Sequence, residues 1–443
     1  YLTVKLLLIQ PTPLLESQNR LFRLMNYIAR KNYFTVPPIS LGILAALTPS
    51  DWEIKIIQEP LQQVDFNEPA DLVGITANTS NVIRGYQISD NFRRRGIAVI
   101  MGGIHPSARA DEALEHCDSV CIGEAELIWN DVLEDLQKKC LKRRYKADTY
   151  FNLNDYTPPR RDLMTASNSL FFSAATVETS RGCPYNCDFC SVSLSHGNRI
   201  RYRQPDSVAE EISKIKRKKI FFVDNNIAAN HRKAKELFKS LIPQKIKWTG
   251  QTTISIADDP ELLKYAVDSG CYGLLIGIES ITDEGFKKYK KSKNDFITLK
   301  SAIKTLNDHR IAVQAHLVFG NDFDTPDSIH ETLDRLNELD IASASLGIMV
   351  PYPGTKLSDD LERGNRILTK NWDLYDINHL VFKPKNFTTE EFLEEIRRIR
   401  NEFFSVGKML ARSINCRKFA ALGFNLSIRS HNQVGLKSNV PVI

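Results

Sequence analysis

Short apolar runs alternate with stretches of helical composition over the first third of the chain. The runs read "VKLLLIQP", "EIKIIQE", "DLVGITA", "AVIMGG" and "SVCIGE". This alternation predicts β and α units that build a parallel, doubly wound sheet. Gly102, Gly103 and Gly123 close the last two runs, and such sheets bind ligands at the carboxyl ends of their strands. We therefore expect a Rossmann-like domain over residues 1–145, with a binding edge at these glycines.

A second series of βα units follows a polar stretch that contains prolines. The stretch "RYKADTYFNLNDYTPPRRDLM" breaks the alternation, and we expect a linker over residues 146–168. The later runs are "LFFSAATVE", "KIFFVD", "IKWTGQTTI", "GLLIGIE", "IAVQAHLVFG" and "SASLGIMVP". They predict a partial (β/α)6 barrel over residues 169–375, open on one side, followed by a basic helical region over 376–443. The expected fold class is α/β.

The composition is that of an ordinary globular protein, because 42% of the 443 residues are apolar and 25% are charged. No apolar run approaches the roughly 18 residues that span a bilayer, so we expect a soluble chain. Eight cysteines are too few for a disulfide scaffold, so we expect a reducing, cytoplasmic setting. Residues 376–443 carry eleven Lys or Arg and six Asp or Glu, and thus most of the net charge of +6. Two interpretations stay open for this region: it lies on an anionic membrane surface, or it docks on the fold through its apolar side. No nucleic-acid partner is expected.

The stretch "RGCPYNCDFC" places Cys183, Cys187 and Cys190 on one loop after the first barrel strand. A structural zinc site needs four ligands, and His196 is the candidate fourth ligand for that interpretation. The alternative is a 4Fe-4S cluster, in which three thiolates hold three irons and the fourth iron stays open for a substrate. The loop leaves the strand at the rim that carries the chemistry in barrels of this type, which favours the cluster.

This cysteine spacing, with Phe189 before the last cysteine, resembles the radical S-adenosylmethionine (SAM) superfamily. The resemblance covers roughly residues 170–375. It implies that SAM binds the open iron, and that an electron from an external donor of the flavodoxin or ferredoxin type cleaves SAM to a 5'-deoxyadenosyl radical.

The resemblance also implies SAM contacts at the strand ends. These are Asp224 and Asn225 at the methionine moiety, Glu279 near the ribose or carboxylate, and Gly320 and residues 351–355, with Tyr352, near the adenine. The alternative for Asp224 and Glu279 is that they cap the helices that follow them.

The segment "IMGGIHPSARADEALEHCDSVCIGEAE" resembles the cobalamin-binding domain of one radical SAM class. Its "GG-x-HP" and "GE-x-E" elements correspond to Gly102, Gly103, His105, Pro106, Gly123, Glu124 and Glu126. The chain has no Asp-x-His-x-x-Gly motif, which implies base-off cobalamin without a histidine ligand. His105 as the lower ligand is the alternative, as is a residue that simply caps the turn. We expect Gly103→Leu to exclude cobalamin and His105→Ala to keep it.

The two resemblances imply a cobalamin-dependent radical SAM methyltransferase that acts on an unactivated carbon of a small-molecule or lipid substrate. The segment "WDLYDINHLVFKPKNFTTEEF" resembles a tail found in a group that includes hopanoid methylases, which favours an apolar substrate. A cyclase, oxidase or rearrangement enzyme with the same two domains is the first alternative. A cobalamin or metal sensor with a zinc-filled loop is the alternative that is not an enzyme.

We predict that replacing Cys183, Cys187 or Cys190 by Ala abolishes both the cluster absorbance and SAM cleavage, because the cluster loses one of three thiolates. Absorbance spectroscopy and deoxyadenosine formation measure the two effects. Cys117→Ala, Cys140→Ala and Cys416→Ala serve as controls that keep both. Deoxyadenosine formation at the wild-type rate in a loop variant would refute the assignment.

Overall fold

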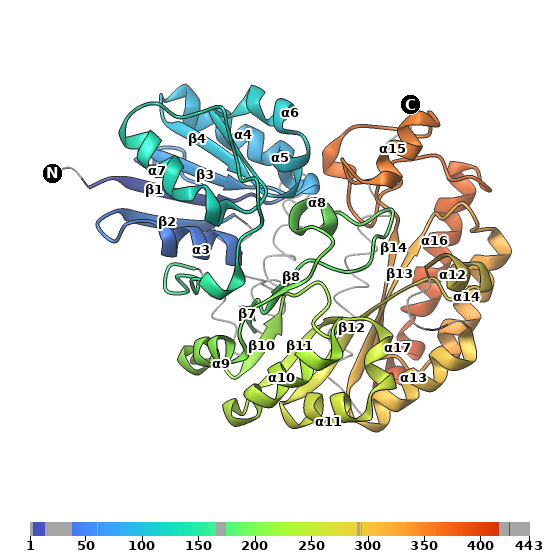
Figure 1. The fold of residues 1–443 in the computed structure, drawn as a ribbon. Coiled ribbons are helices and arrows are strands. Elements are labelled where there is room, and N and C mark those ends of the chain that lie inside the picture. Colours follow the sequence, from blue (N-terminus) through green and yellow to red (C-terminus); the bar gives the residue numbers. More distant parts are fainter. Residues whose placement is uncertain are drawn as a thin grey trace.

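The computed structural model describes residues 3–13, 38–59, 61–164, 174–289, 293, 295–415 and 425. Two α/β units lie side by side, one drawn in blue to teal and the other in green to orange (Figure 1). We call the first unit the front domain and the second the barrel. Each contains a six-stranded sheet in which neighbouring strands are parallel, which confirms the predicted α/β class.

The strands of the front domain follow the order β2-β1-β3-β4-β5-β6. Their bounds are Lys5–Gln10 (β1), Glu53–Gln58 (β2), Leu72–Thr76 (β3), Ala98–Gly102 (β4), Ser119–Ile122 (β5) and Arg144–Lys146 (β6). The first five are the predicted strands. Successive side chains point to opposite faces, so Leu6 and Leu8 join one apolar core and Leu7 and Ile9 join another.

Helices cover both faces of this sheet, as a doubly wound fold requires. One core includes residues of α3 (Ile39–Leu47) and α7 (Trp129–Gln137). The other includes residues of α4 (Val82–Arg94) and α6 (Ala110–His116). The short helix α5 (Ile104–Ala108) lies between β4 and α6.

Strand β6 was not predicted, and it extends by one residue, Lys146, into the stretch expected as a linker over residues 146–168. Arg144 pairs with Val120 and Lys146 with Ile122, in parallel to β5. The Tyr145 side chain is buried and its hydroxyl donates a hydrogen bond to Asp135. A single buried residue between two exposed basic ones is too short to show an alternation, which is why the pattern missed this strand.

The barrel strands follow the order β14-β13-β12-β11-β10-β7. Their bounds are Ala175–Val177 (β7), Lys219–Phe222 (β10), Lys247–Thr252 (β11), Cys271–Glu279 (β12), Ala312–Phe319 (β13) and Ser343–Ile348 (β14). All six were predicted. The order runs from β14 to β7 without pairing these two edges, so the sheet is an open arc, as expected of a partial barrel.

Helices follow the barrel strands. They are α9 (Pro205–Lys214), α10 (His231–Leu241), α11 (Pro260–Asp268), α12 (Asp283–Tyr289), α13 (Phe296–Asp308) and α14 (Pro326–Glu338). On β13, Val313, Ala315 and Leu317 are buried in the core that these helices share, whereas Gln314 and His316 alternate with them and are partly exposed. Gln314 and His316 therefore face the inside of the arc.

A short antiparallel pair frames the cysteine loop and was not predicted. Ser180–Arg181 (β8) pairs with Arg201–Tyr202 (β9), and helix α8 (Val192–His196) lies between them. Each strand has only two residues, too few for any pattern. The pair closes residues 182–200 into a loop that begins and ends at the same place.

The region after the barrel contains helices, as predicted, although its first residues are irregular. Residues 376–388 are irregular, with a bridge between Ile367 and Phe382. Helices α15 (Lys356–Arg363), α16 (Thr389–Phe403) and α17 (Val406–Asn415) flank this segment or follow it. Arg400 anchors α16: its buried guanidinium donates to the Leu346 carbonyl at 2.9 and 2.7 Å and to the Ile377 carbonyl at 3.0 Å.

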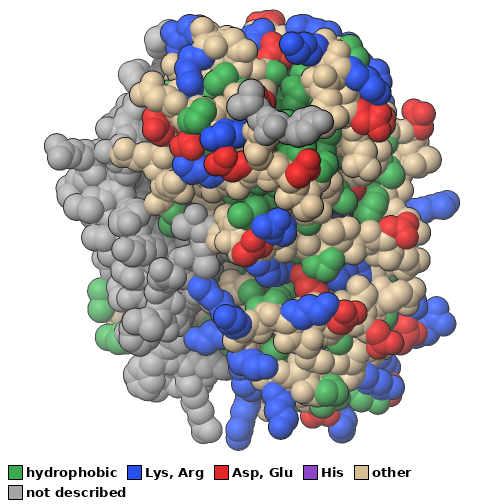
Figure 2. Space-filling view, turned by 90° about the vertical axis from the view of Figure 1, so that its left-hand side faces the viewer, with side chains coloured by type: hydrophobic (Ala, Val, Ile, Leu, Met, Phe, Trp, Pro, Cys, Tyr) green, Lys and Arg blue, Asp and Glu red, His purple; other side chains and the backbone are tan. Residues whose placement is uncertain are grey.

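None of the helices in the described ranges combines the length and apolar character needed to cross a membrane. Acidic and basic side chains are interspersed over the face shown in Figure 2, and lysines and arginines gather toward its lower edge. Apart from Asn425, the basic segment from Cys416 onward lies outside the described residues.

Candidate functional site

The three cysteines lie on the loop between β8 and α8. Each is partly buried, and the Cys190 amide donates to the Cys187 carbonyl at 3.0 Å. Gly182 has φ +94°, and a Cβ there would lie 2.4 Å from the Arg199 carbonyl oxygen, so the turn into the loop requires glycine.

Across the described part of the chain, no three His, Cys, Asp or Glu side chains converge on a single-ion site. Thiolates that each bind a different iron do not need to converge in that way. A loop with three thiol donors therefore fits a 4Fe-4S cluster.

Asp224 holds the strand that leads into this loop. Its buried carboxylate accepts hydrogen bonds from the Thr179 hydroxyl at 2.7 Å, the Thr179 amide at 3.2 Å and the Ser180 hydroxyl at 2.5 Å. Burial raises the pKa of Asp224 to about 6, against these hydrogen bonds, which lower it. Helix α10 takes Asn230 as its N-cap, so Asp224 does not cap that helix. The SAM contacts of Asp224 and its partly exposed neighbour Asn225 remain predictions.

The end of β12 meets the cysteine loop through aromatic rings. Glu279 is buried, has φ +68° and lies at a break in the register between β12 and β13. The Tyr289 ring, one helix further on, meets the edge of Phe189 with centroids 6.0 Å apart, and its hydroxyl donates to Asn321. Phe189 is therefore fixed from the β12 and β13 ends of the barrel.

The ends of the last two barrel strands also reach this region. Burial raises the pKa of Tyr352 to about 12, with contributions from the charges of Asp376 and Cys190, so Tyr352 lies near the last cysteine. A Cβ at Gly354 would lie 3.1 Å from Leu194 on α8 and 3.7 Å from Ala108 on α5. The barrel rim, the cysteine loop and the front domain thus meet at one point.

Gly320 serves packing in this structure. Its φ is +105°, a Cβ there would lie 2.8 Å from the Phe382 ring, and its amide donates to Asp324 at 2.8 Å. The closest neighbour of its missing side chain is thus the segment after the barrel. A contact of Gly320 with adenine remains a prediction.

The structure does not support the expectation that the space beside Gly103 receives cobalamin. Its φ is +103°, and a Cβ would lie 2.5 Å from the Ala77 carbonyl oxygen and 2.9 Å from the Ala77 nitrogen. The space next to it therefore belongs to the chain after β3, so the expectation that Gly103→Leu excludes cobalamin by filling its space does not hold. A Cβ at Gly102 would lie in ordinary contact with Cys121, at 3.5 Å.

Gly123 is different, because its φ is +86° and no atom of the described residues lies within 4 Å of a Cβ built there. Its amide donates to the Ser107 hydroxyl at 3.1 Å. Of the glycines at the front edge named by the sequence, this one leaves open space beside the backbone and fits close approach of a bulky ligand.

His105 is fully buried at the contact between the front domain and the segment after the barrel. Its ring lies edge-on to Trp372, with centroids 5.0 Å apart, and its Nε2 is 3.5 Å from Glu112. The Trp372 indole donates to the same carboxylate at 2.7 Å. This enclosure disfavours His105 as a lower ligand of cobalt.

Glu124 and Glu126 face the barrel. Glu124 accepts hydrogen bonds from Arg201 at 2.6 and 2.8 Å and lies 3.1 Å from the His196 Nδ1 and 3.5 Å from an Arg181 nitrogen. Glu126 pairs with Arg181 at 2.5 Å. Burial alone raises the pKa of Glu124, but hydrogen bonds from His196 and Arg201 and the charge of Arg181 hold it well below its usual value.

The partners of these carboxylates were missed in the sequence, where His196 was considered only as a zinc ligand. Arg181 directly precedes Gly182 and Cys183, and Arg201 lies on β9. The one available signal was two basic residues at the borders of the loop, together with two acidic residues in the front-domain motif.

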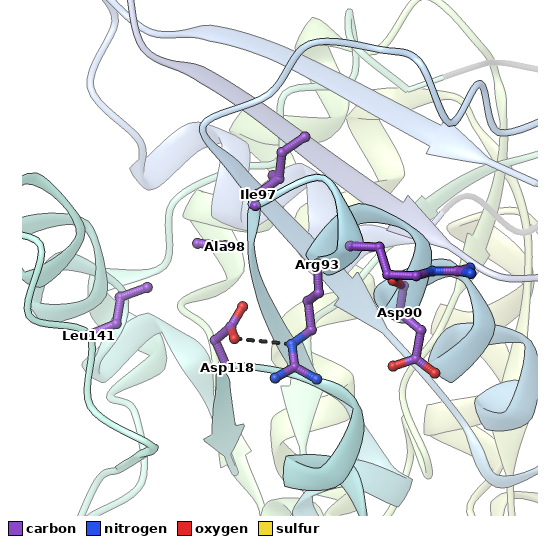
Figure 3. A pocket seen from close by; sticks show the side chains of 8 residues that line it. Asp90, Arg93, Ile97, Ala98, Asp118 and Leu141 are labelled. Atoms are coloured by element: carbon purple, nitrogen blue, oxygen red, sulfur yellow. Dashed lines mark hydrogen bonds and ion pairs between the residues drawn. The ribbon is translucent and has the colours of Figure 1, made fainter.

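A hollow on the surface of the front domain lies elsewhere. It is lined by Arg93, Ile97, Asp118 and their neighbours, and an Arg93–Asp118 pair of 3.0 Å crosses it (Figure 3). Arg93 lies at the end of α4, and Ile97 and Asp118 directly precede β4 and β5, whereas Gly102, Gly103 and Gly123 lie where these two strands end. The hollow is therefore not part of the candidate site.

Comparison with known proteins identifies the barrel. The model of the radical SAM superfamily matches residues 177–354. These residues form a radical SAM domain. The chain is 29% identical over 388 residues to a bacteriochlorophyllide d C-12(1)-methyltransferase of Chlorobaculum tepidum, covering 85% of this chain and 84% of that protein. It is 27% identical to the C-8(2)-methyltransferase of the same organism, covering 90% and 93%.

The fold of this chain is similar to that of a solved enzyme with two bound small molecules. The cobalamin-dependent SAM radical enzyme OxsB, with aqua-cobalamin and SAM bound, superposes with a TM-score of 0.71 over 98% of this chain and 72% of that one, at 15% identity. At this identity the likeness concerns the fold, which spans the front domain as well as the barrel.

We predict opposite outcomes for two alanine substitutions at the front edge. Gly103→Ala lowers the free energy of unfolding by about 2–5 kcal/mol, because backbone strain adds to a clash with Ala77. Gly123→Ala costs about 1–2 kcal/mol, since only strain acts. Gly123→Leu lowers cobalamin retention while the fold persists. Denaturant unfolding and cobalamin content after gel filtration measure these effects, and equal destabilisation by the two alanines would contradict the assignment.

We also predict an acid-sensitive contribution from Glu124. Glu124→Gln lowers the free energy of unfolding by about 3 kcal/mol at pH 7, because it removes the buried carboxylate that binds the partly buried Arg201, whereas Arg181 keeps Glu126 and Glu178. The folded pKa lies below the unfolded one, so this contribution is lost as pH falls below about 4.3. The difference between wild type and variant therefore shrinks in acid. Exposed Glu134, tested as Glu134→Gln, is the control; a constant difference across pH would contradict the prediction.

Proposed function

We propose that this protein is a cobalamin-dependent radical SAM methyltransferase that methylates an unactivated carbon of a large, mainly apolar ring substrate. The supporting observation is that the front edge at Gly123 and the cysteine loop adjoin each other. Residues Glu124 and Glu126, directly after Gly123, bind Arg181 and Arg201 at the two ends of that loop. Both cofactors would thus be held close to one reaction space.

Some of these residues would bind a cofactor directly, and others fix the backbone around the site. Cys183, Cys187 and Cys190 would hold the cluster. Asp224 fixes the strand before the loop through Thr179 and Ser180. When bound, the cluster with SAM supplies a radical that removes hydrogen from carbon, and cobalamin supplies the methyl group. Gly123 would let the backbone approach cobalamin closely.

The inner face of the arc offers polar groups to SAM or the substrate. His316 on β13 faces inward, next to Gly277 on β12 and Ser345 on β14. Its Nε2 is buried without a hydrogen-bond partner among the described residues. Burial lowers the pKa of His316, against the charge of Glu279, so the imidazole is neutral and able to donate or accept one hydrogen bond.

The substrate class is supported by the relatives and by the tail. The two most similar relatives described above are named for bacteriochlorophyllide d, a ring compound. The tail resembles that of a group which includes hopanoid methylases. Both point to a polycyclic, mainly apolar molecule that enters through the open side of the barrel.

The proposal extends to partners and location. An external donor of the flavodoxin or ferredoxin type supplies the electron in a cytoplasmic setting. Helix α17 exposes 56% of Val406 and 43% of Leu410, which lie one turn apart on the same face, and this apolar pair supports a peripheral contact with a membrane. Such a contact would suit delivery of an apolar substrate.

The test is anaerobic purification with cobalamin supplied, followed by incubation with methyl-deuterated SAM and either bacteriochlorophyllide d or a hopanoid extract. We expect iron and cobalamin to stay with the protein after gel filtration, and one product to carry the deuterated methyl group by mass spectrometry. Protein that retains iron but no cobalamin under reducing conditions would overturn the methyltransferase proposal. A product changed without the deuterated methyl would make the cyclase or oxidase alternative the better account.

A further inference from the structure

A buried network of charges crosses from the front domain to the barrel. The side chains of Glu124 and Glu126 are only 3% and 9% exposed, and that of Arg181 is 6% exposed. Two guanidinium nitrogens of Arg201 donate hydrogen bonds to the Glu124 carboxylate, and Arg201 also donates to the Phe151 carbonyl at 2.6 Å. The Phe151 amide in turn donates to Glu124 at 2.7 Å. The network thus includes the segment that joins the two units.

The cationic members all border the cysteine loop. Arg181 lies two residues before Cys183, and it is held on its own side by Glu178 at 2.9 Å. His196 ends α8, directly after the loop, and Arg201 lies on β9, which pairs with β8. The two front-domain carboxylates therefore hold both ends of the loop at once.

The acidic members directly follow the open edge of the front domain. Gly123 has free space beside it, and the next residue, Glu124, is almost fully buried. One short turn therefore combines the edge suited to a bulky cofactor with the grip on the cysteine loop. Any displacement of this turn would change the distance between the front edge at Gly123 and the cysteine loop.

We propose that Glu124 and Glu126 are positioning residues that fix the cofactor edge of the front domain against the cysteine loop. This proposal rests on the proposed function, because it assumes a cofactor at each place. Arginine binds a carboxylate through two parallel hydrogen bonds in one plane, so this contact fixes orientation more narrowly than an apolar contact. Neither residue touches reacting atoms.

A purely structural role is the competing account. Helix α5 packs against α8 near Gly354, and Trp372 packs on His105, so the units have apolar contacts besides the charges. If the charges only add stability, their loss lowers the melting temperature. The separation between the two cofactors is then unchanged in protein that stays folded. If the charges position the cofactors, their loss changes the separation of the two cofactors even at temperatures where the variant is folded.

The test uses the full chain loaded with cluster and cobalamin, with both cofactors in paramagnetic states. Electron paramagnetic resonance measures the magnetic interaction between the reduced cluster and cob(II)alamin, which depends on their separation. Glu126→Gln is the milder variant, because Arg181 keeps Glu178, and Glu124→Gln is the stronger one. Glu124→Asp tests rescue by a carboxylate. Asp118→Asn breaks the Arg93 pair at the opposite edge of the same sheet (Figure 3) and is the matched control.

We expect Glu126→Gln and Glu124→Gln to retain iron and cobalamin, lose or broaden the magnetic interaction, and release more deoxyadenosine per methylated product. Glu124→Asp should recover part of the interaction, and Asp118→Asn should match wild type. An unchanged interaction in folded, loaded Glu126→Gln and Glu124→Gln would overturn the positioning role while leaving the proposed function intact. Wild type that binds no cobalamin would instead overturn the proposed function. If Glu124→Gln does not fold, Glu126→Gln decides the outcome.

Discussion

The arrangement of this protein depends on one buried contact, the carboxylate of Glu124 against Arg201, His196 and Arg181. A buried carboxylate is costly unless cations and hydrogen-bond donors surround it, and here they come from three places along the barrel chain. The contact can form only when β8, β9 and α8 are all in place. Correct folding of the cysteine loop and correct docking of the front domain are thus conditions of each other, and the site exists only when both are met.

The regular part of the fold could be predicted because buried faces of strands and helices produce a periodic pattern of apolar residues in the sequence. Strand Leu72–Thr76 shows an apolar run, and strand Ala312–Phe319 shows alternating buried and partly exposed positions. The strands β6, β8 and β9 show no such pattern, because two or three residues contain no period. They are specified by partners far away: Tyr145 by Asp135, and Arg201 by Glu124. Non-local contacts of this kind cannot be derived from a local pattern.

The candidate site divides along the same line. The cysteine spacing is local, and the structure places all three residues on one loop. The roles of Gly103 and His105 depend on what lies opposite them, which the motif does not tell. Gly103 lies against the backbone of Ala77, and His105 lies against Trp372. The motif thus gave the positions of the residues at the strand ends, but the structural role of each residue depends on the neighbours that it packs against.

The same reasoning explains why polar groups are concentrated where the two units meet. Strand ends of a doubly wound sheet present glycines and backbone amides that suit a ligand, but a ligand site alone leaves the second unit free to adopt several orientations. Chemistry between two bound groups requires a fixed separation, because misplacement by even 1 Å costs rate. Placing the acidic residues directly after Gly123 makes one turn serve both needs. The turn after Gly123 therefore contacts the barrel next to the place where we propose that a cofactor binds, and the geometry of one contact constrains the geometry of the other.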